Sequence, residues 1–506
     1  MVCSRNWLVK GAVSGCFEVN RIISFCTPLL FFSCLAHGQG RWEETDGLVG
    51  LHQDILDLKL YQASQKLEAL SLQQDENLYL ALLGARWAFF SAYIPDHQGA
   101  YLEHEGFFDA QLERVRNGPS EQVRTHMAAA ELHLIKAFLE LKYGSSWGMA
   151  IHGYRSWKAL NRASKIDPNH PMVRYGKGIF EMTLGSLPQN YRFFVRLIGL
   201  NGSVAQGNRW LEEAMNEEAL SGDPFFFPEY AYMSCMVRYQ LFEDSRILLS
   251  DYGISVETSS FFIYMQVLQL QQRGEHERAL ELLVRNSTKN GRTIYPLMDL
   301  VIGKALLNKQ DPTASDYFYR YLNRYKGDNH KKAAFRYLYW HCALADLPAT
   351  GIEMLKQARK LPARSDMDQQ AEEDLNNAIA LPLIRVGLLY DGGYDEQALS
   401  ILDDPGTRAV LHRLSDQMTY YHRKGLIEFR MGRMEAAKES FDKALDLCTE
   451  KSYGCAQSWL FSGRIFAAQG HKNEAKRRFK RVLEQDGFAY FESLQQKART
   501  AMEALD

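Results

Sequence analysis

Two segments near the end of the chain repeat each other in register. They read YHRKGLIEFRMGRMEAAKESFDKALDL, starting at Tyr421, and WLFSGRIFAAQGHKNEAKRRFKRVLEQ, starting at Trp459. The matching positions hold the same kinds of residue: Tyr421 with Trp459, Gly425 with Gly463, Gly432 with Gly470, Ala437 with Ala475, Phe441 with Phe479, and Ala444 with Val482. A fixed period of roughly 40 residues indicates stacked copies of one supersecondary unit, because a single copy cannot bury its own apolar face.

Both segments resemble tetratricopeptide repeats. That family places a large aromatic, a small residue and a second aromatic on the first helix of a pair, and small, aromatic and small residues on the second. Five of these positions in the second copy match: Trp459, Gly463, Phe466, Ala475 and Phe479. In the first copy, Glu428 stands where the family usually has an aromatic. The small residues allow the paired helices to approach closely, and the large ones fill the space between them.

Weaker copies continue upstream, with a small residue paired to a second-helix position: Gly274 with Ala279, Gly303 with Tyr319, Gly351 with Leu355, and Gly393 with Ala398. Hardly any segment alternates like a strand between hairpin turns. The resemblance implies an all-α fold, a right-handed solenoid of antiparallel helix pairs. We expect three parts: an export signal or apolar segment at 1–38, a divergent helical-repeat region at 39–220, and a repeat region at 221–506 that is clearest at 418–486.

The start of the chain has the pattern of an export signal. Arg21 precedes the apolar run from Ile22 to Ala36, and a polar, acidic stretch follows Gly38. The run is shorter than the roughly 20 residues of a membrane span. We therefore expect export to the periplasm or envelope, with cleavage after Gly38, lipidation at Cys34 and an uncleaved membrane tether as the alternatives.

Four cysteines remain beyond that segment, and Cys448 and Cys455 lie seven residues apart. They flank a short linker between helices, where two Cα atoms can come within bridging distance. Export would permit a disulfide there. A bridge between Cys448 and Cys455 and a pair of free thiols both fit this spacing.

Two stretches look like catalytic or nucleotide-binding motifs. GSSWG fits the hydrolase pattern G-x-S-x-G with Ser146 as nucleophile, but that motif must follow a strand, whereas ELHLIKAFLELKY before it has helical periodicity. We interpret it as a turn with Trp147 packed on the next helix. In LIGLNGSVAQGNRW, Gly202 and Gly207 have Walker spacing, yet Asn208 and Arg209 replace the required lysine and hydroxyl. We interpret this stretch as a helix end at Gly199, a turn at Asn201 and a new helix.

Charge and histidine spacing argue against nucleic acid, metal and cofactor. The net charge is −2, so no global field draws the chain to anions. His126 and His133 are seven residues apart, whereas helical metal sites prefer three or four. One basic stripe, Lys476, Arg477, Lys480 and Arg481, fits a solvated helix face, and a patch that contacts nucleic acid or anionic lipid is the alternative.

The resemblance also places side chains in a partner-binding groove lined by the first helices. It places His422, Phe429 and Arg430 there from one repeat, and Gln457 and Arg464 from the next. Leu426 and Leu460 replace the lysine and asparagine of the clamp that other members use for acidic C-termini, so we expect no such clamp. A mixed apolar and arginine surface suits an extended or helical peptide.

We therefore expect a non-catalytic scaffold of the cell envelope that binds a protein partner. The alternatives are an assembly subunit with a large obligate interface, motivated by the 12% aromatic content, and a serine hydrolase that uses Ser146.

Overall fold

The computed structural model describes residues 45–73, 76–186, 202–217, 227–287 and 296–505. Within these ranges every regular element is helical, so the all-α prediction is confirmed there. The described residues form two compact units, with Leu270–Val284 grouped with the second unit and residues 285–287 with the first. The predicted boundary between residues 220 and 221 falls outside the described ranges and stays a prediction.

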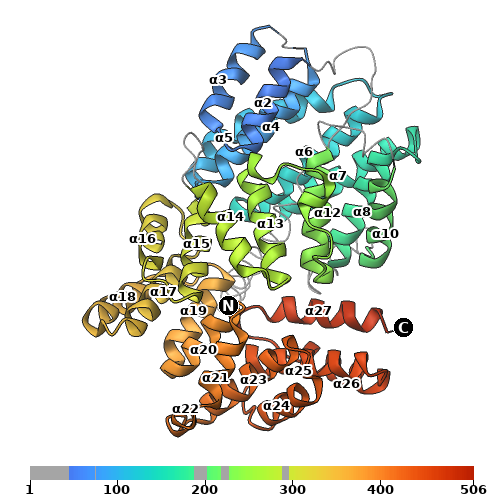
Figure 1. Cartoon of the computed structure of the whole chain (residues 1–506). Helices are drawn as coiled ribbons and strands as arrows, with labels where there is room; N and C mark the ends of the chain where they lie inside the picture. Colours follow the sequence, from blue (N-terminus) through green and yellow to red (C-terminus); the bar gives the residue numbers. More distant parts are fainter. Residues whose placement is uncertain (1–44, 74–75, 187–201, 218–226, 288–295, 506) are drawn as a thin grey trace, which may run out of the picture. The chain divides into compact units, whose positions relative to one another are not determined.

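The first unit, drawn in blue to green in Figure 1, consists of helices that pack in consecutive pairs. Its helices are α2 (Asp46–Leu56), α3 (Leu60–Ser71), α4 (Leu78–Tyr93), α5 (Gln98–Arg116), α6 (Val123–Tyr143), α7 (Ser146–Ile166), α8 (Pro171–Ser186), α10 (Val204–Met215), α12 (Phe227–Phe242) and most of α13 (Ser260–Gln272). The pairs are α2 with α3, α4 with α5, α6 with α7, and α8 with α10.

The second unit, drawn mainly in yellow to red, repeats the same arrangement. Its helices are most of α14 (His276–Ser287), then α15 (Pro296–Asn308), α16 (Ala314–Arg324), α17 (Lys331–Leu344), α18 (Pro348–Lys360), α19 (Asp366–Asn377), α20 (Leu381–Asp391), α21 (Asp395–Asp403), α22 (Pro405–Ala409), α23 (Leu414–Arg430), α24 (Met434–Asp446), α25 (Tyr453–Ala468), α26 (Lys472–Leu483) and α27 (Phe491–Glu503). The two repeats recognised in the sequence are α23 with α24 and α25 with α26.

The turn inside each of these two repeats is set by a glycine in the left-handed conformation. Gly432 has φ of 77° and Gly470 has φ of 78°. The amide of the residue after each glycine donates a hydrogen bond to a carbonyl of the preceding helix. Arg433 donates to the Glu428 carbonyl, and His471 donates to the Phe466 carbonyl. Glycine takes this conformation without a Cβ clash, so it ends the first helix and reverses the chain.

A second glycine in each pair lies against an aromatic ring of the partner helix. A Cβ on Gly425 would lie 2.7 Å from the Phe441 ring, and a Cβ on Gly463 would lie 2.6 Å from the Phe479 ring. Both rings are fully buried. The sequence alignment therefore identified the real contact between the helices of each repeat.

The same contact occurs between α15 and α16, but one residue from the predicted position. A Cβ on Gly303 would lie 2.8 Å from the Phe318 ring, and Phe318 is fully buried. Tyr319, the residue predicted for this position, is 41% exposed. The prediction of Tyr319 was wrong because adjacent aromatics point about 100° apart on a helix, and sequence alone did not fix which one faces inward.

The described part of the glycine-rich stretch, residues 202–214, brings helix α10 against helix α8. Helix α10 begins after Ser203, whose hydroxyl accepts the Gln206 amide. A Cβ on Gly207 would lie 2.5 Å from the Gly178 carbonyl oxygen of α8. The interpretation of this stretch as a joint between helices is confirmed for its described part; Gly199 and Asn201 lie outside the described residues.

We expect Gly207→Ala to lower the free energy of unfolding by about 1–3 kcal/mol, because the new methyl group would press on backbone rather than on a flexible side chain. Gly153→Ala is the matched control, since nothing lies within 4 Å of a Cβ there. That helical substitution should raise stability by about 0.5–1 kcal/mol. Urea unfolding of both variants checks this, and a change of the same sign in both would contradict the close contact of α8 and α10.

No helix in the described ranges combines the length and apolar character needed to cross a membrane. The expected export signal at 1–38, including Cys34, lies outside these ranges. Export and lipidation therefore stay predictions.

Candidate partner-binding surface

Two of the five predicted groove residues come together through a residue that the sequence analysis missed. The Phe429 ring of α23 meets the Phe461 ring of α25 edge-on, with centroids 5.0 Å apart. The Arg464 guanidinium also lies over the Phe461 ring, 4.8 Å from its centroid. The side chains of Phe429, Phe461 and Arg464 are all partly exposed, so they form a surface that spans two repeats.

Arg430 extends this surface toward α20. Its guanidinium lies 3.8 Å from the centroid of the Tyr390 ring, and its Nε donates to Asp395 Oδ2 at 2.6 Å. Its Nη2 donates to the Tyr390 carbonyl at 2.6 Å, and its side chain as a whole is 31% exposed. We call this set the aromatic–arginine strip: Tyr390, Phe429, Arg430, Phe461 and Arg464.

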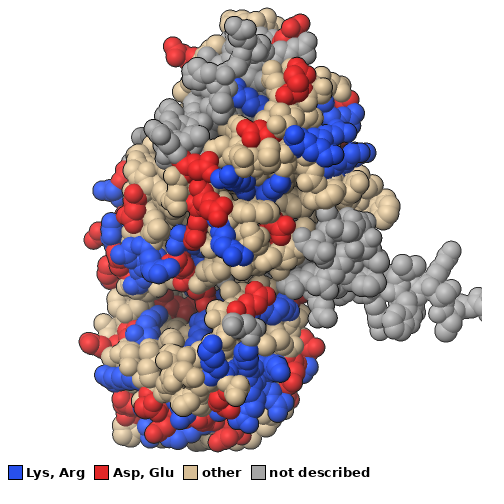
Figure 2. Space-filling model, turned by 90° about the vertical axis from the view of Figure 1, so that its right-hand side faces the viewer, with Lys and Arg blue, Asp and Glu red and all other residues tan. Residues whose placement is uncertain are grey.

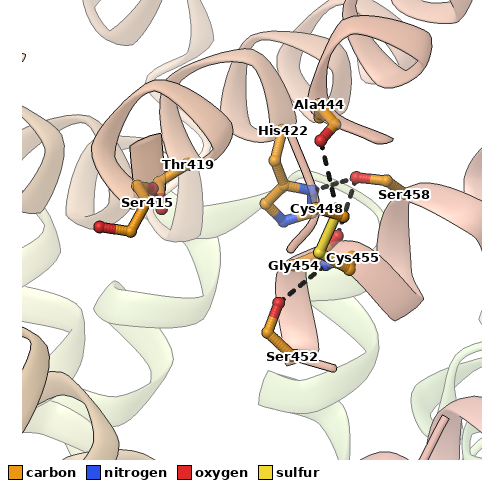
Figure 3. Close-up of a disulfide and its surroundings, with 9 residues drawn as sticks. All are labelled: Ser415, Thr419, His422, Ala444, Cys448, Ser452, Gly454, Cys455 and Ser458. Atoms are coloured by element: carbon orange, nitrogen blue, oxygen red, sulfur yellow. Dashed lines mark hydrogen bonds between the residues drawn. A yellow bond between two sulfur atoms is a disulfide. The ribbon is translucent and has the colours of Figure 1, made fainter. Parts of the chain in front are cut away.

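His422 and Gln457, the other predicted groove residues, have different surroundings. His422 is 6% exposed and lies 3.0 Å from the Ser458 hydroxyl (Figure 3). That hydroxyl donates its only hydrogen to the Gly454 carbonyl, so His422 Nδ1 must be the donor to Ser458. Burial lowers the pKa of His422 to about 3, helped by the nearby Arg423 and opposed by a hydrogen bond with Gln457.

His422 is therefore a neutral interior side chain near pH 7, and a partner would meet little of it. Gln457 is partly exposed and donates to the Tyr453 hydroxyl at 3.2 Å on its own helix. The role of both residues in partner binding stays a prediction.

Cys448 and Cys455 are joined in the structure, between α24 and the first turn of α25 (Figure 3). Their Cα atoms are 6.1 Å apart, within the range of ordinary disulfides. Ser452 caps α25 by accepting the Cys455 amide, so the bridge ties the start of α25 to the end of α24. The remaining cysteines of the described ranges, Cys235 and Cys342, are buried and unbridged.

We expect this bridge to contribute about 2 kcal/mol to stability, because it closes a short loop. Cys448→Ala with Cys455→Ala should lower the unfolding midpoint, and reductant should lower the midpoint of the unmodified chain but not of the variant. Intact mass should be lower by about two hydrogens than that of the reduced chain. Alkylation of both thiols without reductant would show that the bridge does not form.

A contact between distant parts of the second unit was also missed. The Ala489 amide, just before α27, donates to Glu373 Oε1 of α19 at 2.8 Å. Tyr490 follows in the left-handed conformation with φ of 64°, and burial raises the pKa of its hydroxyl. No local pattern in the sequence predicts a contact over this separation. This hydrogen bond therefore ties the segment before α27 to α19.

The GSSWG stretch lies at a turn between two helices. Helix α6 ends at Tyr143, and the Ser145 side chain caps α7 by accepting the Gly148 amide at 2.9 Å. The strand that a nucleophile elbow requires is replaced by helix α6. Trp147 is 76% exposed, so the expectation that it packs on the next helix was wrong. Its position in the first turn of α7 points it to solvent.

In the described ranges, no three His, Cys, Asp or Glu side chains are arranged so that they could hold a metal ion. Charged side chains of both signs are interspersed over much of the face drawn in Figure 2. The basic stripe on α26 is partly neutralised, because Arg477 pairs with Glu474 and Arg481 with Glu484. This pairing agrees with a solvated face.

Comparisons with known proteins support the assignment of the repeats. The family model described as "Tetratricopeptide repeat" matches residues 416–486, which include α24, α25, α26 and most of α23. No curated protein matches the chain. A solved structure titled "Crystal structure of APC/C hetero-tetramer Cut9-Hcn1" is similar at 13% identity over 90% of this chain and 88% of that chain, with a TM-score of 0.24, a likeness too low to carry an argument. The match identifies residues 416–486 as tetratricopeptide repeats, and the other described helices of the chain include further consecutive helix pairs.

Proposed function

We propose that this chain is a non-catalytic scaffold of the cell envelope, and that it binds a peptide segment of a protein partner along the aromatic–arginine strip. The observation that carries this proposal is the strip itself, which presents two arginines and three aromatic rings across α20, α23 and α25. Arginine and aromatic residues dominate the energetics of protein interfaces, because they bury large areas and pair with backbone or carboxylate groups.

The continuity of the strip favours an extended or helical segment over a small ligand. Its side chains come from three first helices of successive pairs, and each is partly exposed or exposed. A peptide laid across these helices would contact several repeats at once. Arg464 lies over the Phe461 ring and its side chain is partly exposed, so a peptide laid along the strip would pass beside it.

Two observations support an envelope location. The apolar run from Ile22 to Ala36 has the length and flanking residues of an export signal. The bridge between Cys448 and Cys455 would persist in an oxidising compartment and would be reduced in the cytosol.

Crosslinking capture from a native envelope extract, with the full chain as bait, tests this function. We expect one reproducible partner, lost when Arg430→Glu is combined with Arg464→Glu. Each reversal places a negative charge beside an aromatic ring of the strip. Because the loss of one interface arginine can cost about 2 kcal/mol or more of binding free energy, we expect the affinity for the partner to fall by well over tenfold.

The matched control reverses two arginines of α26, Arg477→Glu with Arg481→Glu, which lie off the strip. This variant should retain the partner. The proposal would be contradicted if the variant with Arg430→Glu and Arg464→Glu kept the partner. It would also be contradicted if crosslinks formed only between copies of this chain, and that result would favour an assembly subunit. Turnover of an ester by the purified chain, abolished by Ser146→Ala, would contradict its non-catalytic part.

A further inference from the structure

Helix α7 of the first unit has an exposed face on which apolar and basic side chains share one side. Six exposed residues define this α7 face: Trp147, Ile151, Tyr154, Lys158, Arg162 and Lys165. At 3.6 residues per turn they fall within a sector roughly 80° wide. The opposite side of α7 packs on α6, where Ser156 donates to the Ala130 carbonyl at 2.7 Å.

The first half of the α7 face is apolar and aromatic. Trp147 is 76% exposed, Tyr154 41% and Ile151 36%. Indole and phenol rings carry an apolar body and a polar atom, and this combination favours the boundary between water and lipid. In water, three such residues on one side of a helix leave an apolar surface that gains free energy when it is covered.

The second half is basic and has no compensating acid on its own helix. α7 contains no Asp or Glu, and it carries Arg155 in addition to Lys158, Arg162 and Lys165. Within the described ranges, none of these four cations forms an ion pair. Against a chain whose net charge is −2, this helix is a local positive region.

We propose that the α7 face binds the surface of a membrane that contains anionic phospholipid. The Trp147 end enters the interfacial region, and the cations at the other end contact lipid phosphates. Aromatic and apolar residues beside Lys and Arg are the composition of helices that lie in a membrane interface. This binding is independent of the partner that we propose for the second unit.

The apolar half favours lipid over nucleic acid. Cations alone would bind the phosphate backbone of a nucleic acid equally well, and each would add to an affinity that depends on salt concentration. An exposed Ile151 gains nothing from that backbone, whereas it gains free energy in the acyl region of a bilayer. The rings of Trp147 and Tyr154 lie on the same side as Ile151, so all three can enter lipid together.

Vesicle co-sedimentation of the full chain tests the proposal. The probes are vesicles of phosphatidylcholine alone and vesicles of phosphatidylcholine and phosphatidylglycerol in equal parts. We expect stronger partitioning to the anionic vesicles. Lys158→Gln with Arg162→Gln should lower that partitioning by about 30-fold. Each cation near an anionic surface contributes about 1 kcal/mol of binding free energy, and the variant loses two of them. Trp147→Ala should lower it as well, because it removes the apolar anchor.

The control is Lys480→Gln with Arg481→Gln, which removes the same charge from α26 and should leave partitioning unchanged. All variants keep residues 1–38, so any contribution from that segment is common to them. Circular dichroism should show the same helix content in each, since the substituted residues are exposed.

Three results would overturn the proposal. The first is equal partitioning of the unmodified chain to both vesicles, and the second is an equal effect of the α7 and α26 pairs. The third is binding of a nucleic-acid duplex that is lost in the Lys158 and Arg162 variant but unaffected by Trp147→Ala, without binding to anionic vesicles. This last result would assign the face to nucleic acid.

Discussion

Replacing Arg86 by methionine is expected to lower the free energy of unfolding by about 3–5 kcal/mol. Arg86, in α4, is 1% exposed and its Nε donates to Glu131 of α6 at 2.7 Å. Its Nη1 also donates to both carboxylate oxygens of Glu229 of α12, at 3.1 and 3.2 Å. His52 of α2 completes the group, with Nε2 at 2.7 Å from Glu229 Oε1.

The expected cost arises from the carboxylates that remain. Burial alone would lower the pKa of Arg86, but Glu131 and Glu229 raise it above its ordinary value, so the guanidinium stays charged. Both carboxylates are fully buried, and without Arg86 they would be two negative charges in a low-dielectric interior. Four helices of the first unit meet at this group, so its loss should loosen all of them.

Urea unfolding gives the size of the effect, and hydrogen exchange in α4 and α6 shows whether it is local to the first unit. The matched control is Arg116→Met, which removes an exposed arginine whose partner, Glu113, lies 2.7 Å away. That variant should change stability by no more than about 1 kcal/mol. Similar effects of the two substitutions would show that Arg86 is not in a buried, paired environment.

The second large effect is expected from Phe318→Ala, which should lower stability by about 3–5 kcal/mol. The Phe318 ring is fully buried against Gly303 and stacks on Tyr337 with centroids 5.4 Å apart. Removing it leaves a cavity between α15 and α16 that a glycine opposite cannot fill.

The adjacent Tyr319→Ala is the matched control, because the ring of Tyr319 is 41% exposed. We expect it to cost about 1 kcal/mol or less. Chemical unfolding of the two variants decides the register of this repeat. A larger loss for Tyr319→Ala would restore the alignment expected from the sequence and contradict the structure at α16.

The glycine–aromatic contact was predicted correctly between α23 and α24 and only in part between α15 and α16, and this difference shows what a repeat pattern can predict. In α23 and α24 the pattern gave the right contact, Gly425 with Phe441, because two aligned copies fixed the register. Upstream, one weak copy placed Gly303 correctly but chose the neighbouring aromatic. Helix existence and turn positions follow from local preferences, whereas the inward-facing member of an aromatic pair depends on packing with another helix.

Long-range polar contacts could not be predicted from this sequence. His52, Arg86, Glu131 and Glu229 are far apart along the chain, and each resembles an ordinary charged residue on a helix. They meet only because their helices pack together. Phe461 was missed for a related reason: it lies beside the buried Leu460 and outside the aromatic positions of the repeat family.

The central claim is that the second unit binds a protein segment along the aromatic–arginine strip, and site-specific photo-crosslinking tests it most directly. A photoreactive side chain at Phe461 would lie in the strip, and one at the exposed Glu439 of α24 would lie off it. We predict a crosslink to one partner from position 461, abolished by Arg430→Glu with Arg464→Glu, and no crosslink to that partner from position 439. A partner that crosslinks from position 439 and not from 461 would contradict the account.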